Sequence, residues 1–461
     1  MPDKKPSAWR YLWFSQDIRR KLLITLGILM LFRVAANVPA PGVDREALQA
    51  FFSGAGSGGF IGFLNLLSGG TISNFSVLSM GVYPYITAQI ILQLLIPIIP
   101  SLQKRMQEDQ REGRRWMEKW TYYLAVPMAA LSAIGQINTF NALALQQPGG
   151  RVILPFGFSS DLWLSSLTTL LVMTAGTMFA IWLGELISEY GIRGQGLSLV
   201  IFAGIVSQIP QNMIVLWSDQ LNRWSLIAAM VVIMLITVLA IVYVQAGRRN
   251  VPIIYPQKSA IFYAIQRGRS AQVPQPFLPL MVNLAGMIPL IFASALLQFP
   301  AILAGFFIGS ETEWIRNTAT SFQSFFNATG INSWGYWLLY FFMVVGFTYF
   351  YTTVLFDQQN YGDNLKRSGA RIPGVPSGEK TQKYLSRIQS RITFPGALLL
   401  GIVAIMPFLL QLILPAAANN AGLFLVSSSG LLIVVGVVRE MFNNIEAELK
   451  IHGYAEHKLV N

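Results

Sequence analysis

The chain has 461 residues, of which 53% are hydrophobic and only 12% charged, and its mean hydropathy is +0.50. Soluble globular proteins carry about 25% charged residues, so this composition indicates a protein that is dissolved in a lipid bilayer. The chain contains no cysteine, which excludes disulfides and thiolate chemistry. Its two histidines, His452 and His457, lie close to the C-terminus. We therefore expect neither a metal site nor a cofactor.

Apolar stretches long enough to cross the hydrocarbon core, which takes roughly 20 helical residues, occur ten times along the chain. They fall near residues 22–40, 75–97, 120–138, 162–184, 196–216, 226–245, 278–299, 335–355, 395–414 and 421–438. The first stretch follows Lys4, Lys5 and Arg10, and a cleavable signal peptide shares this pattern. A retained span is favoured because about 18 apolar residues can cross the membrane and nine more spans follow.

Lysine and arginine are distributed very unevenly over the segments between these spans. If the N-terminus is cytoplasmic, the inside segments hold 28 of them and the outside segments hold four, which are Arg45, Arg151, Arg223 and Arg316. Arg33 lies within the first span. This asymmetry follows the positive-inside rule, so we expect both termini in the cytoplasm. The net charge of +12 thus reflects topology first, although a basic inner face also suits acidic or ribonucleoprotein partners.

Ten spans divide into two groups of five, and an odd number of spans in each half inverts the second half relative to the first. We place the division near residue 220, which gives halves of residues 1–220 and 221–461. Two motifs recur at corresponding spans: Gly-x-x-Pro-x-Ile at 81–86 and 286–291, and Ile-x-x-Gly-x-Val at 201–206 and 433–438. A proline inside a span bends its helix, and matched interruptions mark the centre of a transport protein. Close helix packing through small residues explains the motifs equally well.

Ionisable residues at membrane depth, which are costly to bury and are kept there for function, are almost missing. Glu185 and Glu189 lie at the inner end of the fourth span. Such a pair could act as general acid and base, but at a helix end it is more often solvated or ion-paired. No His cluster or phosphate-binding loop accompanies it. The alternatives of an ion-coupled solute transporter and of a membrane enzyme are thus disfavoured relative to a conduit for a heterogeneous substrate, such as an unfolded polypeptide.

A short apolar run lies between the first two spans, bounded by glycines at 54–59 and 69–70. It is too short to cross a membrane and too apolar for an ordinary exposed loop. Either it forms a short helix that folds back into the protein, or it lies on the membrane surface.

Strings along almost the whole chain resemble the SecY family, the pore subunits of the bacterial Sec protein translocon. They are residues 38–42, 63–70, 84–86, 112–115, 182–185, 201–205, 278–280, 283–286, 288–289, 291–294 and 431–435. The resemblance implies an all-α polytopic membrane protein with ten transmembrane helices in two inverted five-helix halves around a central pore. It implies a channel, not an enzyme, that passes unfolded secretory polypeptides across the bacterial plasma membrane and releases transmembrane segments laterally into the bilayer.

The resemblance also assigns residues to the parts of such a channel. An apolar pore ring would consist of Val82, Ile86, Ile201, Ile205, Ile291 and Ile433. A plug at about 59–70 would contain Phe60, Ile61, Phe63, Leu64, Leu66 and Leu67. Stiff branched side chains can form a dry seal that offers ions no replacement for hydration.

Spans 2, 3, 7 and 8 would form a lateral gate. Gln93 and Asn283 match polar gate positions of the family, and we expect a hydrogen bond between them, worth about 1 kcal/mol, to hold the gate shut.

Two cytoplasmic loops, residues 245–275 and 357–391, would bind the motor ATPase SecA or a ribosome. Arg248 and Arg249 match basic positions of the first loop. In the second loop Pro376 replaces the usual arginine, and Arg371 or Lys380 could compensate. Further partners implied by the resemblance are signal-bearing preproteins and small SecE-like and SecG-like membrane subunits.

Overall fold

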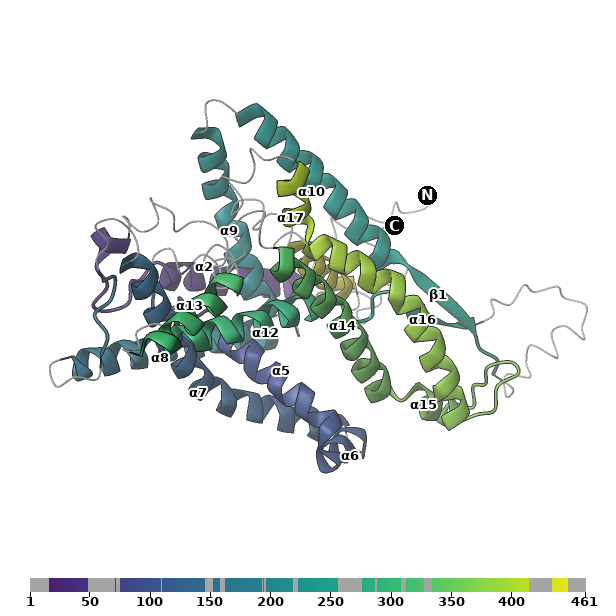
Figure 1. Cartoon of the computed structure of the whole chain (residues 1–461). Helices are drawn as coiled ribbons and strands as arrows, with labels where there is room; N and C mark the ends of the chain where they lie inside the picture. The colour runs from purple at the N-terminus through teal and green to yellow at the C-terminus, as the bar shows by residue number, and fades with distance from the viewer. Residues whose placement is uncertain are drawn as a thin grey trace, which may run out of the picture.

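The part of the chain that the structure describes is helical almost throughout (Figure 1). This computed structural model describes residues 16–48, 71, 75–108, 110–145, 152–157, 162–192, 194, 196–218, 223–255, 276–286, 288–307, 312–326, 334–413 and 433–446. The helices are α2 (Gln16–Ala36), α5 (Tyr83–Ile98), α6 (Pro100–Glu108), α7 (Gln110–Leu145), α8 (Trp163–Tyr190), α9 (Gly196–Ser218), α10 (Arg223–Ala246), α12 (Ile288–Gly305), α13 (Glu313–Phe326), α14 (Trp334–Gln359), α15 (Tyr361–Arg367), α16 (Glu379–Ala404) and α17 (Met406–Ile413). Residues 433–446 are helical as well, and the two strands are β1 (Arg248–Pro252) and β2 (Phe277–Met281).

Several of these helices suit a membrane by length and composition. In the described residues, Trp163–Tyr190 and the run Trp334–Arg367 are each long and apolar enough to cross a bilayer, and shorter apolar helices occupy four other predicted spans. Large apolar side chains such as Leu164, Leu239 and Phe342 point outward from these helices. Such a surface is stable against lipid rather than water. The predicted all-α class is confirmed.

In the first half, the chain that follows α2 pairs with the chain that precedes α5. The Val77 amide donates a hydrogen bond to the Val38 carbonyl at 2.9 Å, and Pro39 lies opposite Ser76 in an antiparallel bridge. Helix α8 closes over this pair, since a side-chain carbon at Gly176 would overlap the Val77 carbonyl. The glycine is therefore required by the close approach of α8 to the backbone.

In the second half, the chain that follows α10 pairs in the same way with the chain that precedes α12. The Val282 amide donates to the Gly247 carbonyl at 2.9 Å, and Arg248 lies opposite Met281 in the β1–β2 ladder. Helix α16 approaches here, since a side-chain carbon at Gly396 would lie 3.0 Å from the Val282 carbonyl oxygen. The two halves thus share a backbone arrangement that no sequence motif had indicated.

Both pairs of segments lead into a helix through a glycine and a proline. Gly81 has φ +52° and Gly286 has φ +66°, a left-handed conformation that glycine adopts without strain. Helices α5 and α12 begin two residues later, and Pro84 and Pro289 are their second residues. Proline in the first helical turn removes no helical hydrogen bond.

These two starts correct two expectations. The spans predicted from residues 75 and 278 are not helical from their first residues, because a left-handed glycine interrupts each. The prolines of the repeated motif initiate their helices, so the prediction that they bend a helix from within is wrong.

The described parts of the two predicted cytoplasmic loops fold together into a small unit at one end of the molecule, next to helices α14 and α16, which pack against each other (Figure 1). Strands β1 and β2 form an antiparallel pair. Ile254 and Arg371 exchange two backbone hydrogen bonds, each of 2.8 Å, which join the first loop to the second. A hydrophobic cluster that includes Val251, Phe356 and Leu385 fills the space between them. We call this unit, residues 248–255, 276–281 and 361–391, the loop platform.

Candidate functional site

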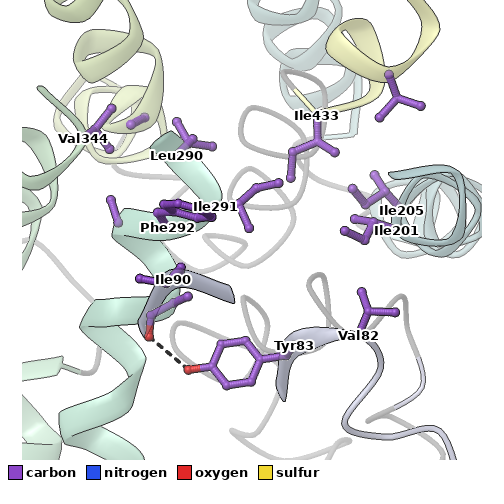
Figure 2. Close-up of a cluster of buried hydrophobic side chains, with 14 of the residues drawn as sticks. Val82, Tyr83, Ile90, Ile201, Ile205, Leu290, Ile291, Phe292, Val344 and Ile433 are labelled. Carbon is purple, nitrogen blue, oxygen red and sulfur yellow. Dashed lines mark hydrogen bonds between the residues drawn. The ribbon is translucent and has the colours of Figure 1, made fainter. Parts of the chain in front are cut away.

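The six residues assigned to a pore ring come together in one buried apolar cluster. Val82, Ile201, Ile205, Ile291 and Ile433 belong to the cluster, with at most 7% of any side chain exposed, and Ile86 packs against it. Ile201 and Ile205 point from α9 toward Ile291 of α12 and Ile433 of the last helix (Figure 2). Side chains from both halves therefore meet at this point.

Local structure explains why these positions face inward. Val82 is the N-cap residue of α5, and Ile86 follows one turn later. Ile291 occupies the same place in α12 as Ile86 in α5, two residues after the motif proline. Ile201 and Ile205 are one turn apart on α9 and so share a face. The paired segments and the left-handed glycines thus fix where α5 and α12 begin, and so where Ile86 and Ile291 lie.

An open cavity of about 660 Å³ leads to this cluster. Ile86, Ile201 and Ile291 are part of its wall, so the cavity reaches the predicted ring. Glu118 of α7 and Glu185 and Glu189 of α8 line it as well. The Glu185–Glu189 pair is accordingly part of a cavity wall beside the apolar cluster.

The arrangement suits passage better than chemistry. Carboxylates at an open mouth attract cationic groups, whereas the aliphatic cluster offers an ion no oxygen to replace its water. Among the described residues, no group of three or more histidine, aspartate or glutamate side chains gathers closely enough to hold a metal ion. The cavity is thus lined both by exposed carboxylates and by aliphatic side chains of the apolar cluster.

A hydrogen bond joins α5 of the first half to α12 of the second. The Tyr83 hydroxyl donates to the Ala295 carbonyl at 3.0 Å, and the bond is buried (Figure 2). Tyr83 lies directly after Val82, and Ala295 lies one turn after Ile291. Sequence reasoning missed Tyr83, although a hydroxyl within the apolar Gly-x-x-Pro motif was a visible signal, since a buried Tyr hydroxyl usually finds a partner.

The polar gate pair differs from its prediction. Gln93 and Asn283 are both buried, but the side-chain oxygens of both lack a hydrogen-bond partner. Asn283 donates instead to the Gly286 carbonyl at 3.0 Å, and Gln93 lies beside the Tyr351 hydroxyl of α14. The expected hydrogen bond between Gln93 and Asn283 is therefore wrong, because Asn283 caps the turn that precedes α12.

Comparison with known proteins settles the family. A family model described as SecY matches residues 76–442. The chain is 36% identical over 448 residues to a protein translocase subunit SecY of Streptomyces scabiei, with 95% of this chain and 97% of the relative covered. It is 34% identical over 446 residues to a protein translocase subunit SecY of Staphylococcus carnosus, with 94% and 95% covered. The chain belongs to the SecY family.

Solved structures show the same fold. A structure described as that of a protein conducting channel aligns with a TM-score of 0.61 at 17% identity, covering 94% of each chain. A second, from work on the plug domain of a SecY protein, aligns with a TM-score of 0.61 at 18% identity and covers 94% of each chain. This SecY-family chain thus keeps the fold of a channel at low sequence identity.

The loop platform of this SecY-family protein carries the predicted basic residues at its surface. Arg248 and Arg249 are exposed on β1, and Lys380 is exposed on α16. The Arg371 side chain is exposed while its backbone holds Ile254. The four predicted side chains are therefore all accessible on one small unit.

Further cations surround them. Lys366, Arg367, Lys383, Arg387 and Arg391 are exposed on α15 and α16. Lys383 contacts Glu379 at 2.7 Å, and this hydrogen bond and charge hold the pKa of the Glu379 carboxyl below its usual value. The remaining cations leave the platform strongly basic.

The plug assignment, from Phe60 to Leu67 within 59–70, lies outside the described residues. The same holds for residues 256–275 of the first predicted loop.

Proposed function

We infer that this chain is the channel-forming subunit of a protein translocase, and that the apolar cluster around Ile291 is its seal. The chain's SecY-family membership gives the protein-conducting activity. The observation that carries the seal is the meeting of side chains from both halves at the floor of an open cavity. As a member of this family the protein is a translocase subunit of the membrane, and not an enzyme in the ordinary sense.

The seal works by excluding water. Val82, Ile86, Ile201, Ile205, Ile291 and Ile433 form the ring that closes the resting pore. β-Branched side chains have few rotamers, so they pack densely and leave no path that a hydrated ion can use. A polypeptide passes because it pushes the ring residues apart, and the ring then closes around it.

The pore opens sideways between the two halves, along the line where α5 meets α12. We call this line the lateral seam; α7 and α14 flank it. Helices α5 and α12 both start beside the ring, so separating them widens the pore and exposes a path to lipid. Gln93 and Asn283 line this region, and their unpartnered oxygens make it less stable when closed.

We propose that Phe60, Ile61, Phe63, Leu64, Leu66 and Leu67 act as a plug for the outer side of the pore. Both termini lie in the cytoplasm, which places the acidic cavity and the loop platform on the inner side. The proposed partners are SecE-like and SecG-like small subunits, the motor ATPase SecA and the ribosome. The exposed cations of the platform support the last two, because they suit acidic or ribonucleoprotein surfaces.

The decisive test reconstitutes the chain with its small partner subunits in vesicles. SecA and ATP are added with a signal-bearing preprotein, and the fraction of preprotein protected from protease is measured. Wild type should protect preprotein and pass no ions at rest. The double variant Ile86→Gly/Ile205→Gly should still protect preprotein but leak ions, because the ring has lost two of its side chains. A wild type that protects no preprotein, or a double variant without a leak, contradicts the proposal.

The platform has a test of its own. Arg371→Ala keeps the backbone bonds to Ile254 but removes the exposed guanidinium. SecA-dependent transport should fall, whereas the ion seal should remain. Unchanged transport removes Arg371 from the docking surface, and the same comparison with Lys380→Ala shows which cation compensates for Pro376.

A further inference from the structure

A buried hydrogen bond crosses the lateral seam from α5 to α12, and its geometry ties it to the ring. The Tyr83 hydroxyl crosses from α5 to the Ala295 carbonyl of α12 at 3.0 Å. Among the described side chains of these two helices, it is the one hydrogen bond that joins them. Only 6% of Tyr83 is exposed, so water does not compete for either partner.

The contact cannot survive opening of the ring. Tyr83 directly follows Val82, while Ala295 lies one helical turn beyond Ile291. Moving Val82 away from Ile291 therefore moves the hydroxyl away from the carbonyl. Figure 2 shows Val82, Ile291 and the bond from Tyr83 in one view.

The backbone around Tyr83 keeps the donor in place. The left-handed Gly81 and Pro84 fix the start of α5 on either side of Tyr83. Close packing of Gly176 against Val77 then holds the preceding segment to α8. The hydroxyl consequently has little freedom to follow α12 when that helix moves.

We propose that Tyr83 is a latch of the lateral seam that sets how hydrophobic a substrate segment must be to open the channel. The proposal rests on the proposed function, because it takes α5 and α12 as the helices that part. An apolar segment enters by replacing helix–helix contacts with its own contacts to the seam. The buried bond opposes this step for every substrate, and a strongly apolar segment overcomes it more easily than a weak one.

The test uses reporter preproteins whose signal segments differ only in stepwise Leu→Ala replacements. Tyr83→Phe keeps the aromatic ring of the side chain and removes only its hydroxyl group. A hydrogen bond between helices in a membrane shifts an equilibrium by roughly threefold to fivefold. Transport of the weakest reporter that wild type accepts should therefore rise about threefold to fivefold in Tyr83→Phe, while transport of the strongest reporter stays unchanged. Tyr83→Met lacks both the aromatic ring and the hydroxyl group, and it should also raise transport of the weak reporter.

Tyr85→Phe is the matched control. Tyr85 is two residues away on the same helix, and its ring centroid lies 5.5 Å from that of Tyr122 of α7. This variant should transport both reporters as wild type does. If Tyr83 had only a structural role, Tyr83→Phe would lower transport of both reporters and the unfolding temperature of the purified protein.

The latch is overturned if Tyr83→Phe leaves weak-signal transport unchanged or lowers transport of both reporters. The ring proposal is tested separately by the ion leak of Ile86→Gly/Ile205→Gly. A leak in that variant together with unchanged weak-signal transport in Tyr83→Phe therefore removes the latch and keeps the seal.

Discussion

The two halves share one backbone arrangement before α5 and before α12, but they differ in what is attached to it. Val77 and Val282 each donate to the chain that follows the preceding long helix, and each is covered by a close glycine. Val77 and Val282 each lie four residues before a left-handed glycine, Gly81 and Gly286 respectively. The shared part is backbone geometry, which fixes where Ile86 and Ile291 enter the ring.

The two halves differ in what each adds to this shared backbone arrangement. In the first half the pairing consists of a single bridge, and the helix start carries Tyr83, a donor. In the second half the pairing continues into five residue pairs and then into the loop platform, and Ile288 takes the place of Tyr83. In the proposed mechanism, this repeated backbone arrangement holds a seal in common, while one half provides the latch and the other the docking surface.

The largest expected effect comes from disrupting the close packing of α8 and α16 against the paired backbone segments. Leucine at Gly176 or at Gly396 would overlap or crowd a backbone carbonyl, and such overpacking costs about 3 kcal/mol or more in the free energy of unfolding. Both variants should unfold at clearly lower temperature in detergent than Gly346→Leu, since Gly346 of α14 has open space around it. Equal unfolding temperatures for Gly396→Leu and Gly346→Leu would mean that the second half is not held as the first is.

A smaller effect should follow from the left-handed glycine of the second half. Gly286 has φ +66° and no atom within 4 Å of an added side-chain carbon, so substitution there tests backbone conformation alone. Gly286→Val should lower the free energy of unfolding by about 1–2 kcal/mol, because β-branched residues are strained in this region. Gly81→Val, at φ +52°, should cost at least as much. A Gly286→Val protein as stable as wild type argues against the shared helix start.

The loop platform, which only the second half carries among the described residues, can be weakened at the backbone hydrogen bonds of Arg371. Proline at this position removes the amide that donates to Ile254, which should cost roughly 1 kcal/mol. We expect Arg371→Pro to increase protease cleavage of the platform, whereas Arg371→Ala should leave cleavage at the wild-type rate. Identical cleavage of both variants would show that the backbone pair does not hold the two loops together.

The smallest effect, and one of opposite sign, concerns Gln93. Its side-chain oxygen is buried without a partner, whereas its contact with the Tyr351 hydroxyl is also lost in an apolar variant. We expect the first effect to exceed the second, so that an apolar residue of similar size stabilises the closed seam by less than about 1 kcal/mol. Gln93→Leu should lower weak-signal transport by about twofold, the reverse of Tyr83→Phe. An increase instead would mean that Gln93 makes a contact that holds the seam closed.

The six residues proposed for the ring sit in recognisable strings of the sequence, and the structure gathers them in one buried apolar cluster; their role as a ring stays a prediction. Ile201 and Ile205 are one turn apart in a helix, and Ile86 and Ile291 share a motif. Sequence reasoning failed for Gln93 and Asn283, since the choice between a partner across the seam and the nearby Gly286 carbonyl depends on how the turn before α12 folds. It also missed the Val77 and Val282 pairings, because backbone groups bond alike whatever the side chain. The proline motif misled, since only the left-handed glycines place Pro84 and Pro289 in a first turn.

The central claim is that side chains of both halves close the resting pore together. The most direct measurement is the ion conductance of the reconstituted channel in a planar bilayer, at rest and without substrate, for Ile86→Gly and Ile291→Gly. Leu296→Gly, at an exposed position of α12, is the control for a glycine in a helix. Both ring variants should conduct ions well above wild type, and the control should stay closed. A channel that leaks with only one of the two ring variants, or with neither, would contradict a seal built equally from both halves.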